Sequence, residues 1–400
     1  MNPRILALGA TTQSLLRPAL TSLMAVAVFS SKLALAVDAL ERAALIELYN
    51  STNGDAWTDN SNWKISTGGF NAIGTECTWH GVHCWVGLDV NYIGLFDNNL
   101  VGTMPQLLGL QHLFKINVGS NQLSGSIPDF SYAPQLQEFN ASDNLLSGTI
   151  SSSLSSSMEL QVFNVHGNNL TGNIPDISQL AQLTSFDVGD NSLTGSFPSA
   201  LTTLTHLQSI DVSQNADLTG DIPQDLGSLT ELTHFVANDD DLTGLLPDLS
   251  GLSNLQIFNV EGNRIAGSIT GIEALSQLIV FDIGHNRIDG PIPDLSALQQ
   301  LNSFFAYDNK LSGALPDLGT LSALQRFQVQ YNQLSGVLST IPPPNGTPGE
   351  SHLCPNEIAA PYDPLLNIAW NIATTGMAGS PWWGPPGAGC DEIFKNLFEP

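Results

Sequence analysis

Residues 160–175 read LQVFNVHGNNLTGNIP, and this stretch decides the fold. Phe163 and Val165 alternate with polar residues at the two-residue period of a β-strand, so both point to the same side. Asn168 follows where the chain has to turn, and residues 172–175 supply a tight bend with one inward aliphatic side chain. The stretch therefore predicts a short strand, a sharp turn and an irregular return segment.

The same pattern recurs along the chain with a step of 23–25 residues, and a polar residue after the strand marks each repeat. These residues are Asn98, Asn121, Asn144, Asn168, Asn191, Asn215, Asp240, Asn263, Asn286, Asn309 and Asn332. A fixed period of this length is typical of a solenoid, because one coil cannot bury its apolar stripe without neighbours. We expect a right-handed solenoid of about eleven coils with a parallel β-sheet on its concave face.

The marker asparagines predict a ladder of side chains inside the turn. An asparagine amide can both donate to and accept from backbone groups that a sharp turn leaves unpaired. Asp240 accepts hydrogen bonds but cannot donate one when it is ionised. We therefore expect the coil of Asp240 to be the weakest point of the ladder.

The repeats extend over residues 88–340, and both flanking segments have the features of caps. Within the amino-terminal cap, residues 37–87, the apolar spacing of residues 37–48 favours a short amphipathic helix. Residues 341–400 leave the repeat and contain tryptophans at 370, 382 and 383. A solenoid needs such covers because its terminal coils would otherwise expose the core.

Residues 1–36 have the composition of a signal peptide. They contain three basic residues and no acidic residue, and an apolar stretch leads to Ala34-Leu35-Ala36, a small-x-small cleavage pattern. We therefore expect a secreted or extracellular protein, and a periplasm or a cell surface stays open as an alternative location. No later segment approaches the roughly 18 to 20 uninterrupted apolar residues of a membrane span, so we expect no membrane insertion.

The chain is strongly acidic, with 11 lysines and arginines against 37 aspartates and glutamates and a net charge of -26. Without the three cations of the predicted signal peptide, 8 basic residues remain against 37 acids, a net charge of 8 - 37 = -29. Such a charge argues against nucleic acids and anionic membranes as partners.

Four cysteines form two local pairs, Cys77 with Cys84 and Cys354 with Cys390. In an exported protein such pairs suggest disulfides that close short loops near the chain ends. The two histidines between Cys77 and Cys84 offer an alternative, because two thiolates and two imidazoles can bind zinc in a tetrahedral arrangement.

The segment Cys77-Thr-Trp79-His-Gly81-Val82-His-Cys84 and the recurring Leu-Thr/Ser-Gly-x-Ile-Pro units resemble the plant-type extracellular leucine-rich-repeat family. The resemblance covers roughly residues 37–340. That family includes receptor-kinase ectodomains and polygalacturonase-inhibiting proteins, and similar secreted proteins occur in bacteria. The resemblance implies recognition of a ligand or protein on the concave face, and it favours disulfides over a metal site. We expect no metal and no cofactor.

The outward strand positions near the carboxyl end combine aromatic side chains, an arginine and polar groups. Aromatic and arginine side chains are enriched at binding hot spots, so these residues are our candidates for contact with a protein or polysaccharide. The candidates are Asp282, His285, Phe305, Tyr307, Asp308, Arg326, Gln328 and Tyr331. An alternative is that the aromatic residues pack beneath the carboxyl-terminal cap.

A basic column follows the ladder in three consecutive coils and comprises Arg264, Arg287 and Lys310. Neighbouring members should lie about 5 Å apart and repel one another unless acidic groups intervene. Salt bridges to Glu261, Asp282 and Asp308 are one interpretation, and recognition of a carboxylate-bearing ligand is the other.

Asp187 and Asp211 share one outward column on adjacent coils. Their expected separation is compatible with the roughly 5 Å of a retaining glycosidase pair, but nothing predicts a water-excluding cleft around them. The chain also lacks familiar nucleophile, metalloprotease and phosphate-loop motifs. We expect a recognition protein without catalytic residues. A cell-surface or matrix structural protein is the alternative, and a glycoside hydrolase is a weaker one.

Overall fold

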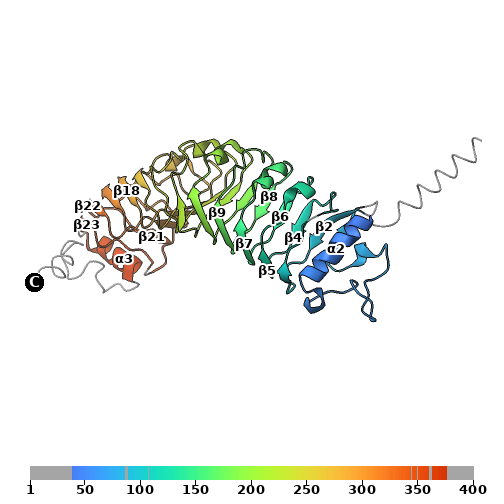
Figure 1. Cartoon of the computed structure of the whole chain (residues 1–400). Coiled ribbons are helices and arrows are strands. Elements are labelled where there is room, and N and C mark those ends of the chain that lie inside the picture. The colour runs from blue at the N-terminus through green and yellow to red at the C-terminus, as the bar shows by residue number, and fades with distance from the viewer. Residues whose placement is uncertain are drawn as a thin grey trace, which may run out of the picture.

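The computed structural model describes residues 38–375 except 86–88, 107, 344, 349 and 360–362. These residues form one elongated, arched body in which successive coils stack side by side (Figure 1). The predicted signal peptide, the tryptophans at 382 and 383, and Cys390 lie outside the described residues.

The main sheet contains twelve strands in the described part of the chain and lines the concave face. All neighbours are parallel except the first pair, which is antiparallel. In order, the strands are β1 (Val82–Cys84), β2 (Val90–Gly94), β4 (Lys115–Asn117), β6 (Glu138–Asn140), β8 (Val162–Asn164), β10 (Ser185–Asp187), β12 (Ser209–Asp211), β14 (His234–Val236), β15 (Ile257–Asn259), β17 (Val280–Asp282), β19 (Ser303–Phe305) and β21 (Arg326–Gln328).

The Leu-Thr/Ser-Gly units of the repeat form two smaller parallel sheets beside the main one. The first contains β3 (Val101–Thr103), β5 (Gln122–Gly125), β7 (Leu145–Thr149), β9 (Asn169–Asn173), β11 (Ser192–Ser196) and β13 (Asp217–Thr219). The second contains β16 (Ala266–Ser268), β18 (Arg287–Gly290), β20 (Lys310–Gly313), β22 (Gln333–Val337) and β23 (Glu357–Ala359).

Short 3₁₀ helices form parts of the return segments, where the prolines of the repeat disfavour a continuous α-helix. Those in the repeats are Phe130–Tyr132, Ser152–Ser156, Ser199–Thr203, Leu226–Ser228 and Ile272–Ala274, and two more, Gly54–Ala56 and Glu76–Thr78, lie in the amino-terminal cap.

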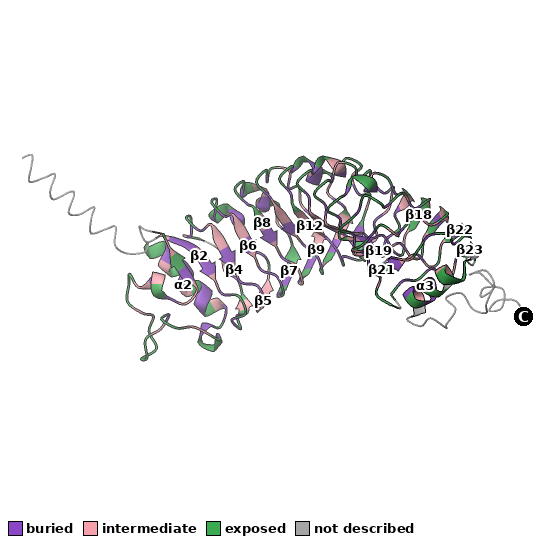
Figure 2. Ribbon diagram, turned by 180° about the vertical axis from the view of Figure 1, so that it is seen from behind, coloured by how far each residue is buried: buried purple, intermediate pink, exposed green. Residues whose placement is uncertain are grey.

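The core is a stack of inward side chains, as the alternation in residues 160–175 predicts. Buried residues recur on successive strands of the ribbon (Figure 2). Neighbouring strands pair in register, so that Phe163 lies beside Phe186 with ring centroids 5.8 Å apart. The stack resumes from Phe235 to Phe327, where successive centroids lie 5.4–5.5 Å apart. This regular packing fixes the register of every outward residue on the opposite side of the sheet.

The asparagine ladder is confirmed. The side-chain nitrogen of Asn168 donates to the carbonyls of Ala141, Val165 and His166 at 3.0–3.1 Å, and its oxygen accepts from the backbone nitrogen of Leu146 at 2.9 Å. These bonds satisfy backbone groups of two adjacent coils inside the core. Each ladder residue therefore ties its own coil to the preceding one.

Asp240 departs from this pattern as expected. Its Oδ1 accepts from the backbone nitrogen of Asn215 at 2.7 Å, but Oδ2 is buried without a hydrogen-bond partner. Burial raises the pKa of Asp240 to about 8, so the side chain is mostly protonated at neutral pH. A protonated carboxyl carries one donor, whereas the amide of asparagine carries two.

The ladder continues one coil beyond the predicted repeats. Asn356 is buried, donates to the carbonyls of Val329 and Leu353 at 2.7 and 2.6 Å, and accepts from the backbone nitrogen of Leu334 at 3.0 Å. The solenoid therefore has about twelve turns, and β23 (Glu357–Ala359), which pairs with β22, lies in the segment that the sequence assigns to the carboxyl-terminal cap.

The amino-terminal cap begins with the predicted helix, which is α2 (Ala39–Ser51). Its buried face contains Leu45, Leu48 and Tyr49. Tyr49 packs against Trp57 and Trp63, with ring centroids 5.0 and 5.4 Å apart. This aromatic cluster covers the first coil, which agrees with the capping role that its sequence predicts.

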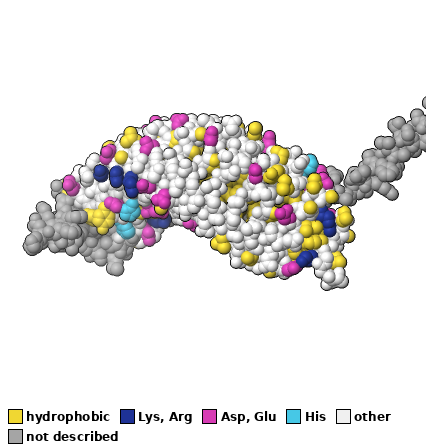
Figure 3. All heavy atoms as spheres, viewed as in Figure 1, with side chains coloured by type: hydrophobic (Ala, Val, Ile, Leu, Met, Phe, Trp, Pro, Cys, Tyr) yellow, Lys and Arg dark blue, Asp and Glu magenta, His cyan; other side chains and the backbone are white. Residues whose placement is uncertain are grey.

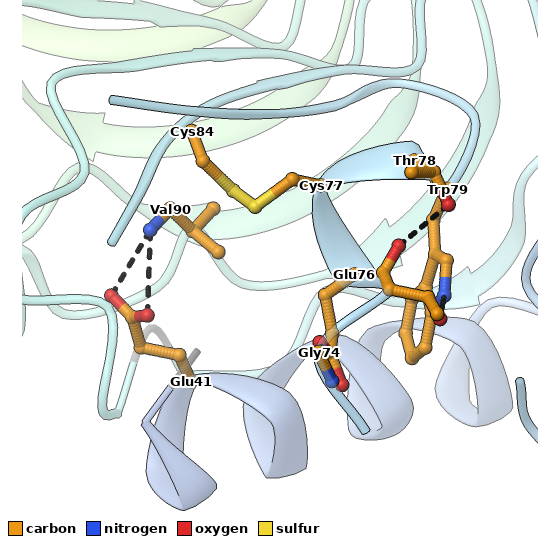
Figure 4. The surroundings of a disulfide bond; sticks show 9 residues. Glu41, Gly74, Glu76, Cys77, Thr78, Trp79, Cys84 and Val90 are labelled. Atoms are coloured by element: carbon orange, nitrogen blue, oxygen red, sulfur yellow. Dashed lines mark hydrogen bonds between the residues drawn. A yellow bond between two sulfur atoms is a disulfide. The ribbon is translucent and has the colours of Figure 1, made fainter. Parts of the chain in front are cut away.

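The first cysteine pair forms a disulfide between Cys77 and Cys84, with Cα atoms 5.6 Å apart (Figure 4). Because both sulfur atoms are joined to each other, neither cysteine can bind zinc as a thiolate. The predicted alternative of a zinc site at these residues is therefore wrong. Glu41 of α2 lies on the same side of the cap and accepts from the backbone nitrogen of Val90, at 3.2 and 3.4 Å to its two oxygens (Figure 4).

At the other end, α3 (Pro364–Thr375) packs against the last coils. Trp370 is buried, and its indole nitrogen donates to the carbonyl of Thr340 at 2.8 Å. Cys354 is disulfide-bonded, and its predicted partner Cys390 lies outside the described residues. No helix within the described residues is long and apolar enough to cross a membrane.

Candidate recognition surface

The carboxyl-terminal part of the concave face brings most of the predicted contact residues together. His285 Nδ1 lies 2.6 Å from Asp308 Oδ2 on the next coil. The imidazole also meets the ring of Tyr307 edge to face, with centroids 4.9 Å apart. These three side chains therefore hold one another in fixed positions on the outer surface of the sheet.

Tyr307 is anchored by a residue that the sequence did not identify as a contact candidate. Its hydroxyl donates a hydrogen bond to Glu261, two coils away. The ring lies over Gly284, where an added Cβ would come within 2.8 Å of two ring carbons. Burial, reinforced by the bond to Glu261, raises the pKa of Tyr307 above its usual range.

Phe305 and Arg326 form a second pair beside this group. The guanidinium carbon of Arg326 lies 5.1 Å from the ring centroid of Phe305, and its Nε donates to Ser303 Oγ at 3.0 Å. Gln328 follows in the column of Phe305 and donates to the carbonyl of Glu350 at 3.3 Å. Gln328 thus connects the column of Phe305 to the last coil.

Tyr331 is the most accessible of the predicted aromatic contacts, with 59% of its surface exposed. Phe305 and Tyr307 are half-buried against neighbours on the sheet. Phe305 contacts Arg326, and Tyr307 contacts His285 and Glu261, all of them residues of the repeats. The alternative that they pack beneath the carboxyl-terminal cap therefore gains no support.

Asp282 does not present its carboxylate as a contact residue would. The residue is only 8% exposed, and its Oδ1 accepts from the backbone nitrogen of Gly284 at 3.0 Å. Burial raises the pKa of Asp282 to about 7, and the negative charge of Glu261 adds to the rise. Asp282 therefore holds the backbone of the following residues in place and is not itself available to a partner.

The predicted basic column lies outside the main sheet. Arg287 and Lys310 belong to β18 and β20, and all three cations are exposed. Figure 3 shows a row of basic side chains on this half of the molecule. Arg264 pairs with Asp241 at 2.8 Å. The predicted salt bridges are wrong, because Glu261 instead binds Tyr307, Asp308 binds His285 and Asp282 is buried.

The two aspartates that suggested a glycosidase pair lie side by side, as predicted, because Asp187 and Asp211 share one register position. His166 joins them, with Nδ1 3.4 Å from Asp187 Oδ1. Burial, together with the charge of Asp211, raises the pKa of Asp187 to about 6. The sequence places His166 on the concave face but does not show that it reaches these carboxylates.

Comparison with known proteins agrees with the architecture. The family model described as Leucine Rich Repeat matches residues 182–204. No match was found among curated protein sequences.

Among solved structures, the ectodomain of the Arabidopsis receptor kinase HAESA in complex with an IDA peptide hormone is 26% identical. It aligns over 80% of this chain and 53% of its own, with a TM-score of 0.66. The plant peptide hormone receptor RGFR1 in complex with RGF2 is 32% identical, over 69% of this chain and 48% of its own, with a TM-score of 0.57.

A plant ice-binding protein shares the fold at 22% identity, over 78% of this chain and 91% of its own, with a TM-score of 0.56. The chain spans about half the length of the two receptor ectodomains that it matches. The asparagine ladder, the cap disulfide and the similar structures all indicate the same leucine-rich-repeat fold. The chain thus contains leucine-rich repeats and is similar to the plant-type extracellular leucine-rich-repeat proteins.

Proposed function

We propose that the protein is secreted and recognises a protein partner through the carboxyl-terminal part of its concave face. We name this part the recognition surface. It comprises His285, Phe305, Tyr307, Asp308, Arg326, Gln328 and Tyr331. The observation that carries the proposal is the exposure of Tyr331 beside a row of aromatic and arginine side chains that neighbouring groups already fix.

Such an arrangement suits binding for an energetic reason. A complex loses free energy when side chains are immobilised on association, and groups held in place beforehand avoid much of that cost. Tyr307 is fixed by Glu261, and Arg326 is fixed by Phe305 and Ser303. Aromatic rings on a rigid sheet can then bury a large apolar area with little further ordering.

The charge of the surface indicates the chemistry of the partner. Glu261 and Asp308 lie at this end of the concave face, above the buried Asp282, and the whole chain carries a net charge of -26. A partner with basic residues would complement this field, and its association would weaken as salt rises. A basic protein segment therefore fits better than an acidic polysaccharide.

The receptors described above support a protein partner, since both were solved with a peptide or hormone bound. Secretion rests on the pattern of residues 1–36. We propose no enzymatic role, because Asp187 and Asp211 lie on the open face of a sheet. A structural protein would show no saturable affinity for any soluble partner, which distinguishes it from a recognition protein.

The test is a binding screen of the purified protein against arrays of secreted proteins, basic peptides and cell-wall polysaccharides. The variant Tyr331→Ala removes the exposed ring of the recognition surface. Tyr132→Ala is the matched control, because Tyr132 is 40% exposed on a 3₁₀ helix away from the main sheet. A saturable protein hit that is lost only with Tyr331→Ala supports the proposal. The proposal is contradicted if nothing on any array binds, or if only polysaccharides bind.

A further inference from the structure

Three side chains with metal-binding chemistry meet on the concave face, away from the recognition surface. Asp187 ends β10 and Asp211 ends β12, and both occupy the same register position. His166 lies two residues beyond the end of β8, on the preceding coil. One ligand atom from each residue lies within 4.8 Å of the others.

His166 turns a nitrogen toward the carboxylates without using it in a hydrogen bond. Its Nδ1 is buried and has no hydrogen-bond partner, although Asp187 Oδ1 lies 3.4 Å away. Leaving a buried polar atom unpaired costs free energy. A group that accepts the lone pair of this nitrogen and also neutralises the carboxylates would remove that cost.

Gly189 lies beside two of the three ligands and leaves them unobstructed. A Cβ on Gly189 would lie 2.9 Å from His166 Nδ1 and 2.8 Å from Asp211 Oδ1. A side chain at this position would therefore press on two of the three ligand groups. Glycine leaves His166 and Asp211 free to approach one another.

The carboxylates are also held in position by the backbone. Asp187 Oδ1 accepts from the nitrogen of Gly189 at 3.2 Å. Asp211 Oδ1 accepts from the nitrogen and the Oγ of Ser213, at 3.0 and 2.6 Å. Hydrogen bonds of this kind orient metal ligands and strengthen binding. The cluster is therefore largely preformed on a rigid sheet.

We propose that His166, Asp187 and Asp211 bind one divalent transition-metal cation of the zinc class. Imidazole and carboxylate are ordinary zinc ligands, whereas calcium and magnesium prefer sites made entirely of oxygen. Ligands at about 2.0–2.1 Å from a tetrahedral zinc ion lie roughly 3.4 Å apart, so small side-chain rotations close the cluster. Three protein ligands leave a fourth position, which faces the open side of the sheet.

The test uses the full chain, freed of metal by a chelator and titrated calorimetrically with zinc chloride and, in parallel, calcium chloride. The variants are His166→Gln, Asp187→Asn and Asp211→Asn, each checked for folding by circular dichroism. The matched control is His285→Gln combined with Asp308→Asn. That pair lies 2.6 Å apart but, among the described residues, is not part of a three-ligand cluster.

We expect the wild type and the control to bind one equivalent of zinc and to bind calcium far more weakly. Each site variant that folds should lose about tenfold or more in zinc affinity. Two site variants suffice if the third does not fold. The proposal is overturned if the wild type binds no zinc, if calcium binds as tightly, or if the site variants match the control.

Discussion

The hydroxyl of Tyr307 donates to the carboxylate of Glu261, two coils away, and the tyrosine ring lies directly over Gly284. One aromatic side chain thus spans three consecutive coils of the concave face. The hydrogen bond between Tyr307 and Glu261 requires that the middle coil has no side chain at position 284. A substitution of Gly284 can therefore disrupt the bond while both partners stay unchanged.

We predict that Gly284→Ala displaces the ring of Tyr307. The new Cβ would lie 2.8 Å from two ring carbons, so the hydroxyl should lose Glu261 and the free energy of unfolding should fall by about 1–3 kcal/mol. Urea denaturation measures this change. Gly69→Ala is the control, because the nearest atom to its Cβ would be 3.8 Å away. Equal stability of the two variants would contradict the predicted contact.

The ladder predicts a sharp contrast between two adjacent asparagines. Asn168 makes four side-chain hydrogen bonds to backbone groups, and Asn169 is exposed. Asn168→Ala leaves those groups unpaired and should cost about 2–4 kcal/mol of unfolding free energy, whereas Asn169→Ala should change it by less than about 0.5 kcal/mol. Denaturant unfolding of both variants measures the difference, and similar values for the two would refute the role of the ladder.

Asp240 predicts a pH-dependent stability that one substitution removes. Burial raises its pKa to about 8, above the value of about 3.9 in an unfolded chain. The folded state therefore binds this proton more tightly. Stability contributed by the protonated form is complete below about pH 4 and is lost progressively as the pH rises through about 8.

Asp240→Asn removes this loss and supplies the missing amide donors. We expect the variant to be more stable than the wild type by several kcal/mol above pH 8, and the difference to shrink by about 1.4 kcal/mol per pH unit toward pH 5. Thermal unfolding across this range measures the effect. Asp190→Asn, an exposed change one residue before a ladder position, is the control. A constant difference between Asp240→Asn and the wild type at all pH values would refute the shifted pKa.

The basic column gives a prediction about acidic polysaccharides. Arg264, Arg287 and Lys310 lie on consecutive coils, and only Arg264 has an ion pair among the described residues. If the column binds carboxylates, charge reversal at Arg264 and Arg287 should abolish retention on polygalacturonate at low salt. Reversal of Lys115, on the concave face, is the control. Unchanged retention of the double variant would exclude the column as a binding site.

Periodicity made most of the fold predictable, because the ladder and the inward strand positions follow from one repeated pattern. The last coil was missed for a physical reason. Its Leu353 and Asn356 keep the spacing, but Ser351 stands where the other coils place the first inward hydrophobic residue, and prolines precede it. The ladder bonds of Asn356 identify this coil, and the sequence offers only its step of 24 residues from Asn332.

The candidate surfaces were only partly predictable, because register fixes neighbours but not the reach of side chains. The sequence placed Tyr307 and His285 on one surface, yet it paired Glu261 with the basic column instead of Tyr307. It likewise placed Asp187 beside Asp211 but missed His166, since that contact depends on the space over Gly189. Glycines in outward positions are therefore informative signals of contacts between coils.

The most direct test of recognition by the concave face is the dissociation constant of the strongest protein hit, measured calorimetrically for the wild type, Tyr331→Ala and Tyr132→Ala. A binding hot spot contributes at least about 2 kcal/mol, which corresponds to roughly a thirtyfold change in affinity. We predict a loss of this size for Tyr331→Ala and an unchanged affinity for Tyr132→Ala. Equal affinities for all three proteins, or a loss confined to Tyr132→Ala, would contradict the proposed recognition surface.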